Sequence, residues 1–192
     1  MAETPTTGAE LQALIRQLDA SCRAQRTALP HDAPPPDSWA AVLFRVRDLK
    51  FLTPLEQIAE VLEVPVEITR VPGTHPWFLG VANNRGTLLP ISDLAVLTQG
   101  GQSGAHHAPP GRRRARDRVL VVRQGESPCG LVVSETLGMR HVRHDARSPT
   151  LPEGLGASAR YVERAYQVDD EAVAVLRLER LLADPLFNAA LG

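Results

Sequence analysis

Cys129 is the side chain whose chemistry most invites a catalytic interpretation. It stands between Pro128 and Gly130 and opens an apolar stretch of the chain. An exposed cysteine with a lowered pKa would supply a nucleophilic thiolate. Small cysteines that begin apolar strands are, however, commonly buried among aliphatic neighbours. We therefore predict that Cys129 is packed in the core and inert, and a thiol-dependent enzyme remains the competing hypothesis.

The histidines are the other side chains that could bind a metal or move a proton. They include His75, the pair His106 and His107, and His141 and His144. No two of them have the i, i+4 spacing that fixes two ligands on one helix face. The chain also lacks the short motifs that cradle phosphate, bind dinucleotides or present a catalytic serine. We expect no metal site, no cofactor and no enzymatic activity.

A basic run at residues 112–116 could bind a phosphate backbone. It contains four arginines, but no aromatic residue is interleaved to stack on bases. The whole chain carries 21 Lys and Arg against 22 Asp and Glu, a net charge of -1, so no global field attracts nucleic acid. We predict a solvated loop that can help to dock an acidic partner. A nucleic-acid-binding β-barrel protein that uses this loop is the alternative, and its affinity would collapse with salt.

The composition favours a mainly β protein that lies in the cytoplasm. Only 4% of the 192 residues are aromatic, and Val and Leu recur in short runs bounded by Gly and Pro. The two cysteines, Cys22 and Cys129, suit neither a zinc site nor a disulfide scaffold. Residues 1–10 are polar and acidic, unlike a signal peptide, and no apolar stretch is long enough to span a bilayer. We expect no direct insertion into a membrane.

The N-terminal region predicts a helix followed by a linker. Apolar residues recur at steps of three and four between residues 11 and 26, which is the pattern of an amphipathic helix. Prolines at 30, 34, 35 and 36 then exclude regular structure. We divide the chain into the helix and linker at 1–38, a body at 39–185 with a flexible loop at 98–117, and a tail at 186–192.

The body reads as a series of short strands. Residues 39–54 predict a hairpin that turns at 47–50, whereas 55–62 fits either a helical turn or a strand. A second hairpin, with strands at 77–82 and 87–91, closes on residues 83–86, where Asn and Gly tolerate the positive φ that such turns demand.

The rest of the body predicts further strands and a terminal helix. Strands resume at residue 118, where we expect a second barrel to begin. A last hairpin turns at 169–171, and the spacing of Leu178, Leu181 and Leu182 predicts a short helix that caps the barrel.

The segment Gly80–Leu94 resembles the signature of CheW-type coupling proteins. It reads GVANNRGTLLPISDL and fits G-x-x-N-x-R-G-x-x-x-P-[IV]-x-D-L. Because this pattern is long, it is specific, and the resemblance extends over about residues 39–185. The segment from 39 to 62, Trp77 and the motif itself most resemble the subgroup of that family that serves chemotaxis-like systems controlling type IV pili and twitching motility.

The resemblance implies a fold, partners and a site. The fold would be two SH3-like five-stranded β-barrels, the first interrupted by the second in chain order. The partners would be the regulatory domain of a CheA-type histidine kinase and the hairpin tip of a chemoreceptor. Arg85 and Glu60, with Ile58 and Met139 as apolar neighbours, match the receptor-facing positions. Arg85 could instead pair internally with Glu60 or Asp93 and brace its own turn.

Other residues of the motif are expected to shape the turn. We assign Asn83, Gly86 and Pro90 to the geometry of the hairpin, and we expect Asp93 to cap the turn that follows Ile91. Two residues depart from the family pattern. Asn84 stands where an apolar residue is usual, and Ser134 stands where the family often has Asp.

Overall fold

The computed structural model describes residues 37–98, 115–124 and 127–188. The predicted N-terminal helix, the proline-rich linker and most of the predicted 98–117 loop lie outside these residues. Within them, no helix is long and apolar enough to cross a membrane.

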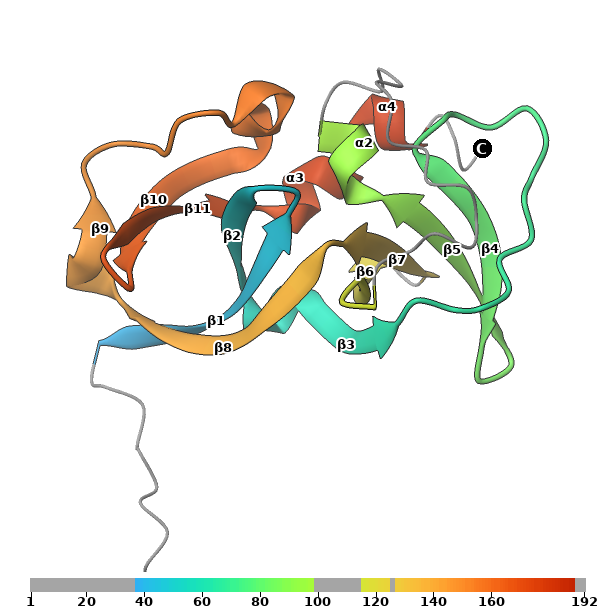
Figure 1. Ribbon diagram of the computed structural model, residues 1–192, viewed down its shortest axis with the longest axis horizontal. Helices are drawn as coiled ribbons and strands as arrows, with labels where there is room; N and C mark the ends of the chain where they lie inside the picture. The colour runs from blue at the N-terminus through green and yellow to red at the C-terminus, as the bar shows by residue number, and fades with distance from the viewer. Residues whose placement is uncertain (1–36, 99–114, 125–126, 189–192) are drawn as a thin grey trace, which may run out of the picture. The chain divides into compact units, whose positions relative to one another are not determined.

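The first sheet has six strands in the order β8-β1-β2-β11-β10-β9 (Figure 1). All neighbours are antiparallel except β2 and β11, which run parallel. The strands are β1 (Ser38–Val46), β2 (Leu49–Pro54), β8 (Glu135–Arg143), β9 (Arg147–Ser148), β10 (Val162–Val168) and β11 (Glu171–Leu176). The two-residue β9 is one strand more than the five that we predicted for each barrel.

The second sheet has five strands in the order β3-β6-β7-β5-β4. The strands are β3 (Ile58–Glu63), β4 (Phe78–Asn84), β5 (Thr87–Asp93), β6 (Arg118–Gln124) and β7 (Ser127–Val133). The prediction that a second barrel begins at residue 118 is wrong, because β7 pairs with both β6 and β5 and so completes this sheet. The chain returns to the first sheet only at Ser134. The interruption of one sheet by the other, which the family resemblance implied, is confirmed.

The predicted hairpins form, and their turns use non-glycine residues with positive φ. Arg47 has φ 55° in the β1–β2 turn, and Asp169 and Asp170 have φ 51° and 64° between β10 and β11. The ambiguous segment 55–62 contains both alternatives, since the 3-10 helix η1 (Leu55–Gln57) leads directly into β3.

Short helices occupy the ends of the sheets. They are α2 (Leu94–Thr98), η2 (His144–Ala146), η3 (Gly156–Tyr161), α3 (Leu178–Leu182) and α4 (Pro185–Asn188). The predicted C-terminal helix is confirmed as α3. The expected tail from residue 186 differs, because α4 places Phe187 in the core at 1% exposure.

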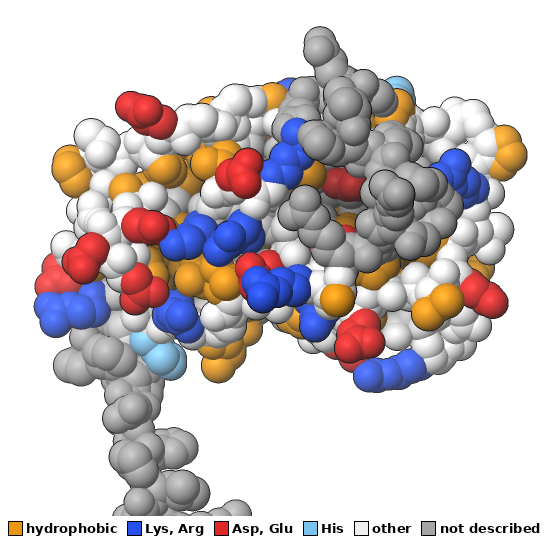
Figure 2. Space-filling view, viewed as in Figure 1, with side chains coloured by type: hydrophobic (Ala, Val, Ile, Leu, Met, Phe, Trp, Pro, Cys, Tyr) orange, Lys and Arg blue, Asp and Glu red, His pale blue; other side chains and the backbone are white. Residues whose placement is uncertain are grey.

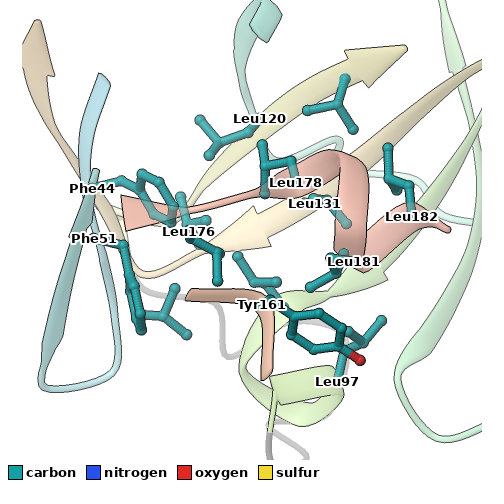
Figure 3. Close-up of a cluster of buried hydrophobic side chains, with 14 of the residues drawn as sticks. Phe44, Phe51, Leu97, Leu120, Leu131, Tyr161, Leu176, Leu178, Leu181 and Leu182 are labelled. Carbon is teal, nitrogen blue, oxygen red and sulfur yellow. The ribbon is translucent and has the colours of Figure 1, made fainter. Parts of the chain in front are cut away.

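The largest hydrophobic cluster joins the two sheets through α3. In Figure 3 the leucines of α3 lie among Phe44 and Phe51 of the first sheet and Leu120 and Leu131 of the second. Leu178, Leu181 and Leu182 are all buried, as their spacing predicted. Burying one such side chain stabilises the fold by about 1.5–3 kcal/mol, so α3 fixes one sheet to the other. We call this cluster the inter-sheet core.

Each sheet also has a smaller core of its own. In the six-stranded sheet it includes Leu43, Leu52 and Tyr166, and in the five-stranded sheet it includes Leu89 and Ile91. Because successive strand residues point to opposite faces, one face of each sheet lines its own core and the other faces the inter-sheet core.

Candidate functional site

The β4–β5 turn presents Arg85 at its tip. Arg85 has φ 53° and Gly86 has φ 86°, and positive φ at both central positions is typical of a tight two-residue hairpin turn. The side chain of Asn83 reinforces the turn, since its Oδ1 accepts a hydrogen bond from the Gly86 amide at 2.8 Å. We expected Asn and Gly to adopt the positive φ, whereas Arg85 takes the first of the two positions.

Arg85 on the β4–β5 turn forms an ion pair with Glu60 on β3, the strand at the other end of this sheet. Arg85 Nη2 lies 2.6 Å from Glu60 Oε1, with side-chain exposures of 76% and 31%. The structure thus brings together two of the predicted site residues, in the internal pairing that we left open. Such exposed pairs contribute only about 0.2–1 kcal/mol to stability. The pair therefore orients the guanidinium more than it stabilises the fold.

Asp93 does not pair with Arg85. Its Oδ1 accepts hydrogen bonds from the amides of Ala95 at 2.9 Å and Val96 at 3.2 Å, at the start of α2. Pro90 lies opposite Val81 on β4, one residue before the parallel pairing with β7 begins at Ile91. Proline has no N–H to donate, but because Pro90 precedes the parallel pairing, no hydrogen bond of that pairing is lost.

Ile58 and Met139 lie on different sheets, and each adjoins the face that lines the inter-sheet core. Ile58 is half-buried against the inter-sheet core. Met139 is 57% exposed on β8, and its neighbour in register on β1 is Val42, which belongs to that core. Residues in register on adjacent strands project from the same face, so Met139 extends the core toward solvent.

Two further exposed apolar residues lie on these faces, and the sequence did not single them out. Val61, 42% exposed, is in register with Leu120 of the inter-sheet core. Leu88, 72% exposed, lies two residues before Pro90 and on the same face of β5. The sequence gives no clear signal for them, because apolar residues stand side by side in both β3 and β5 and only the structure shows which of them are exposed. We call Ile58, Val61, Leu88 and Met139 the seam surface.

Ser134 supports the crossing from one sheet to the other. Its Oγ accepts a hydrogen bond from the Arg47 amide at 2.8 Å, and its own amide donates to the Arg45 carbonyl at 2.9 Å. The adjacent Glu135 contacts Arg45 at 3.7 Å and Arg116 at 3.4 Å. A serine hydroxyl therefore holds the β1–β2 turn.

Cys129 is packed as predicted. It is 2% exposed within the inter-sheet core, and burial raises the pKa of its thiol to about 12. At neutral pH it is protonated and screened from solvent, so a thiolate nucleophile is absent at this position. In the described part of the chain, no three His, Cys, Asp or Glu side chains assemble into a metal-binding group.

Charges of both signs are mixed on the face shown in Figure 2, and the described residues there form no broad basic patch. Of the basic run, Arg116 is described and pairs with Glu135, whereas residues 112–114 lie outside the described ranges.

Residues 40–186 match the family model of the CheW-like domain. The chain therefore belongs to the CheW-like family, the class of protein that the two interleaved sheets and the β4–β5 motif indicate. Among curated proteins, PilI of Pseudomonas aeruginosa is 37% identical over 139 residues, covering 72% of this chain and 73% of that protein. FrzA of Myxococcus xanthus is 31% identical over 143 residues, covering 72% of this chain and 82% of that protein.

A solved structure has the same fold. The scaffolding protein TtCheW from Thermoanaerobacter tengcongensis superposes with a TM-score of 0.62 at 20% identity, over 78% of this chain and 91% of that one.

Proposed function

We propose that this chain is a non-catalytic adaptor that couples a chemoreceptor to a CheA-type histidine kinase. Its similarity to PilI supports a role in a chemotaxis-like system that controls type IV pili and twitching motility. Such an adaptor works in the cytoplasm and is recruited to membrane-associated receptor arrays through its partners.

The observation that carries this proposal is the exposed apolar surface beside a fixed arginine. The seam surface leaves Leu88 and Met139 more than half exposed, although Met139 is in register with the buried Val42. Exposed apolar side chains that gather into a patch are typical of docking surfaces. Arg85 stands on the same hairpin as Leu88 and adds a charged group to that hairpin.

The geometry of Arg85 suits a helical partner. Arg85 contacts Glu60 through Nη2, and its side chain is 76% exposed. The remaining guanidinium N–H groups can therefore donate to a carboxylate or to a backbone carbonyl on a docking helix. Because the turn is short and held by the side chain of Asn83, the Arg85 guanidinium loses little conformational freedom on binding.

The kinase would dock elsewhere, at a sheet edge. Unpaired backbone groups on an edge strand can be met by a partner strand or covered by apolar contacts. The outer strands here are β3 and β4 of one sheet and β8 and β9 of the other. The bridge between Thr69 and Val81 already occupies part of the β4 edge.

A bridging experiment tests the proposal. The regulatory domain of a CheA-type kinase from the same organism is immobilised, and a receptor hairpin-tip fragment is added with and without this chain. We expect the receptor fragment to be retained only when the chain is present. Direct retention without the chain, or no retention with it, would contradict the adaptor function.

A further inference from the structure

The segment between β3 and β4 borders a groove that the adaptor function does not use. In Figure 1 this segment runs as a long loop from β3 to the start of β4. The groove has a volume of about 400 Å³. It is lined chiefly by Arg70, Val71, Pro72, His75, Phe78 and Leu79.

Hydrogen bonds hold the walls of this groove in place without a ligand. The amide and carbonyl of Thr69 both bond to Val81 at 2.8 Å, which anchors the near end of the loop. At the far end, the Trp77 carbonyl accepts from the Asp93 amide at 2.7 Å. The hydroxyl of Thr74 donates to the Val71 carbonyl at 2.8 Å and closes the turn between them. A groove built this way needs little ordering when it binds a ligand.

An aromatic column supports the groove from behind. The ring of His75 lies parallel to that of Trp77 at 5.8 Å, and Trp77 stacks on Phe187 at 5.3 Å. Trp77 and Phe187 are buried, whereas His75 is exposed at the rim. One face of the imidazole is therefore turned toward the Trp77 ring.

The charged side chain in the described lining of the groove is that of Arg70. Arg70 is exposed, and none of the ion pairs among the described residues includes it. None of the described residues that line the groove is acidic, and apart from His75 and Thr74 its other described lining residues are apolar, with Val71 at 41% exposure. The volume accommodates one or two side chains rather than a helix. Residues 99–114 of this chain contain three arginines and no carboxylate, so they do not match this charge.

We propose that this groove binds a short extended peptide of a partner protein, in which an acidic residue is followed by an aliphatic one. The carboxylate pairs with Arg70 at the rim, and the aliphatic side chain lies on Val71, Phe78 and Leu79. Charge-assisted hydrogen bonds of the guanidinium are the stronger contribution, and the apolar floor selects the neighbouring residue. This site is separate from Arg85 and the seam surface.

The test is a titration of the full ¹⁵N-labelled chain with two synthetic peptides. The acidic probe is Ac-DLEV-NH2, and its charge-reversed control is Ac-KLKV-NH2. We expect the acidic peptide to shift the amide resonances of residues 70–79 in a saturable manner, and the basic peptide to leave them in place. The substitution Arg70→Glu should weaken binding at least about tenfold, because a hydrogen bond to a charged group contributes about 1.5–3 kcal/mol.

Arg147→Glu is the matched control, since Arg147 is also exposed but lies on β9 of the other sheet. It should bind the acidic peptide as the unmodified chain does, and well-dispersed spectra will show that both variants are folded. Shifts scattered over the surface, equal shifts with both peptides, or undiminished binding by Arg70→Glu would each overturn the proposal. So would the absence of any shift at millimolar peptide. None of these outcomes depends on kinase or receptor binding.

Discussion

Phe187 offers a sharp test of how the C-terminal segment is held, because it lies beyond the 40–186 region that matches the family model. It is 1% exposed, and its ring stacks on Trp77 at 5.3 Å with an interplanar angle of 12°. The short α4 has few other anchors, notably the hydrogen bonds that Asp184 accepts from the amides of Leu186 and Phe187, both at 2.9 Å.

Substitution Phe187→Ala should therefore cost most of what α4 contributes. Truncating a buried phenylalanine typically costs about 3–5 kcal/mol. The lower figure applies here, because a four-residue helix near the end of the chain can relax into the space. For a domain of this size, about 3 kcal/mol lowers the melting temperature by about 6–12 °C.

The assay is thermal and urea denaturation followed by circular dichroism, with tryptophan emission as a second signal. Loss of the Phe187 ring exposes Trp77, so the native emission should shift to the red. Leu186→Ala is the control, since Leu186 lies on the same helix but is 56% exposed. Its free energy of unfolding should stay within about 0.5 kcal/mol of the unmodified chain. Equal effects of the two substitutions would refute the view that α4 is docked through Phe187.

Three further expectations follow from the contacts described. In a double-mutant cycle of Arg85→Ala and Glu60→Ala, the coupling free energy should be about 0.2–1 kcal/mol and should fall with added salt; a coupling of several kcal/mol would make the pair a structural brace. Tyr161 donates a hydrogen bond to Asp184 at 2.6 Å, and this bond lowers the pKa of that carboxyl. The bond to ionised Asp184 stabilises the fold above the carboxyl's unfolded pKa, near pH 4. This stabilisation is lost as the pH falls through the lower pKa that the carboxyl has in the folded chain. Tyr161→Phe should thus destabilise the chain at neutral pH by about 1–2 kcal/mol, with a difference that narrows in acid; a pH-independent difference would argue against this bond. The thiol of Cys129 should react with a thiol reagent only as fast as the fold opens, so rapid labelling of the native chain would show that the cysteine is accessible.

Local pattern was enough to place most of the strands and the last helix. The alternation around residues 39–54 and 162–176 predicted the hairpins, and the leucine spacing predicted α3, because these elements are stabilised by contacts near in sequence. The membership of β6 and β7 in the sheet of β3–β5 was not predictable from periodicity. It depends on the parallel pairing of Ile91 with Gly130, which joins segments far apart in the chain.

The site was predictable only in part, and for a similar reason. The motif identified Arg85 and Glu60, but their pairing at 2.6 Å depends on how β3 and the β4–β5 turn approach each other in space. Leu88 and Val61 look like ordinary strand residues in the sequence. Only the structure shows that Leu88 is 72% exposed and that Val61 is exposed beside the buried Leu120. Phe187 was assigned to a tail because a single aromatic residue near a terminus has no periodic context.

The central claim is that Arg85 docks a receptor hairpin, and calorimetric titration with the receptor fragment tests it most directly. Lys50 provides a matched control, because it also pairs with a glutamate, Glu171, but on the six-stranded sheet. Arg85→Glu and Lys50→Glu each place two carboxylates face to face. The account predicts that Arg85→Glu weakens binding at least about tenfold while Lys50→Glu leaves the dissociation constant unchanged. Unaltered binding by Arg85→Glu, or equal losses for both variants, would contradict it.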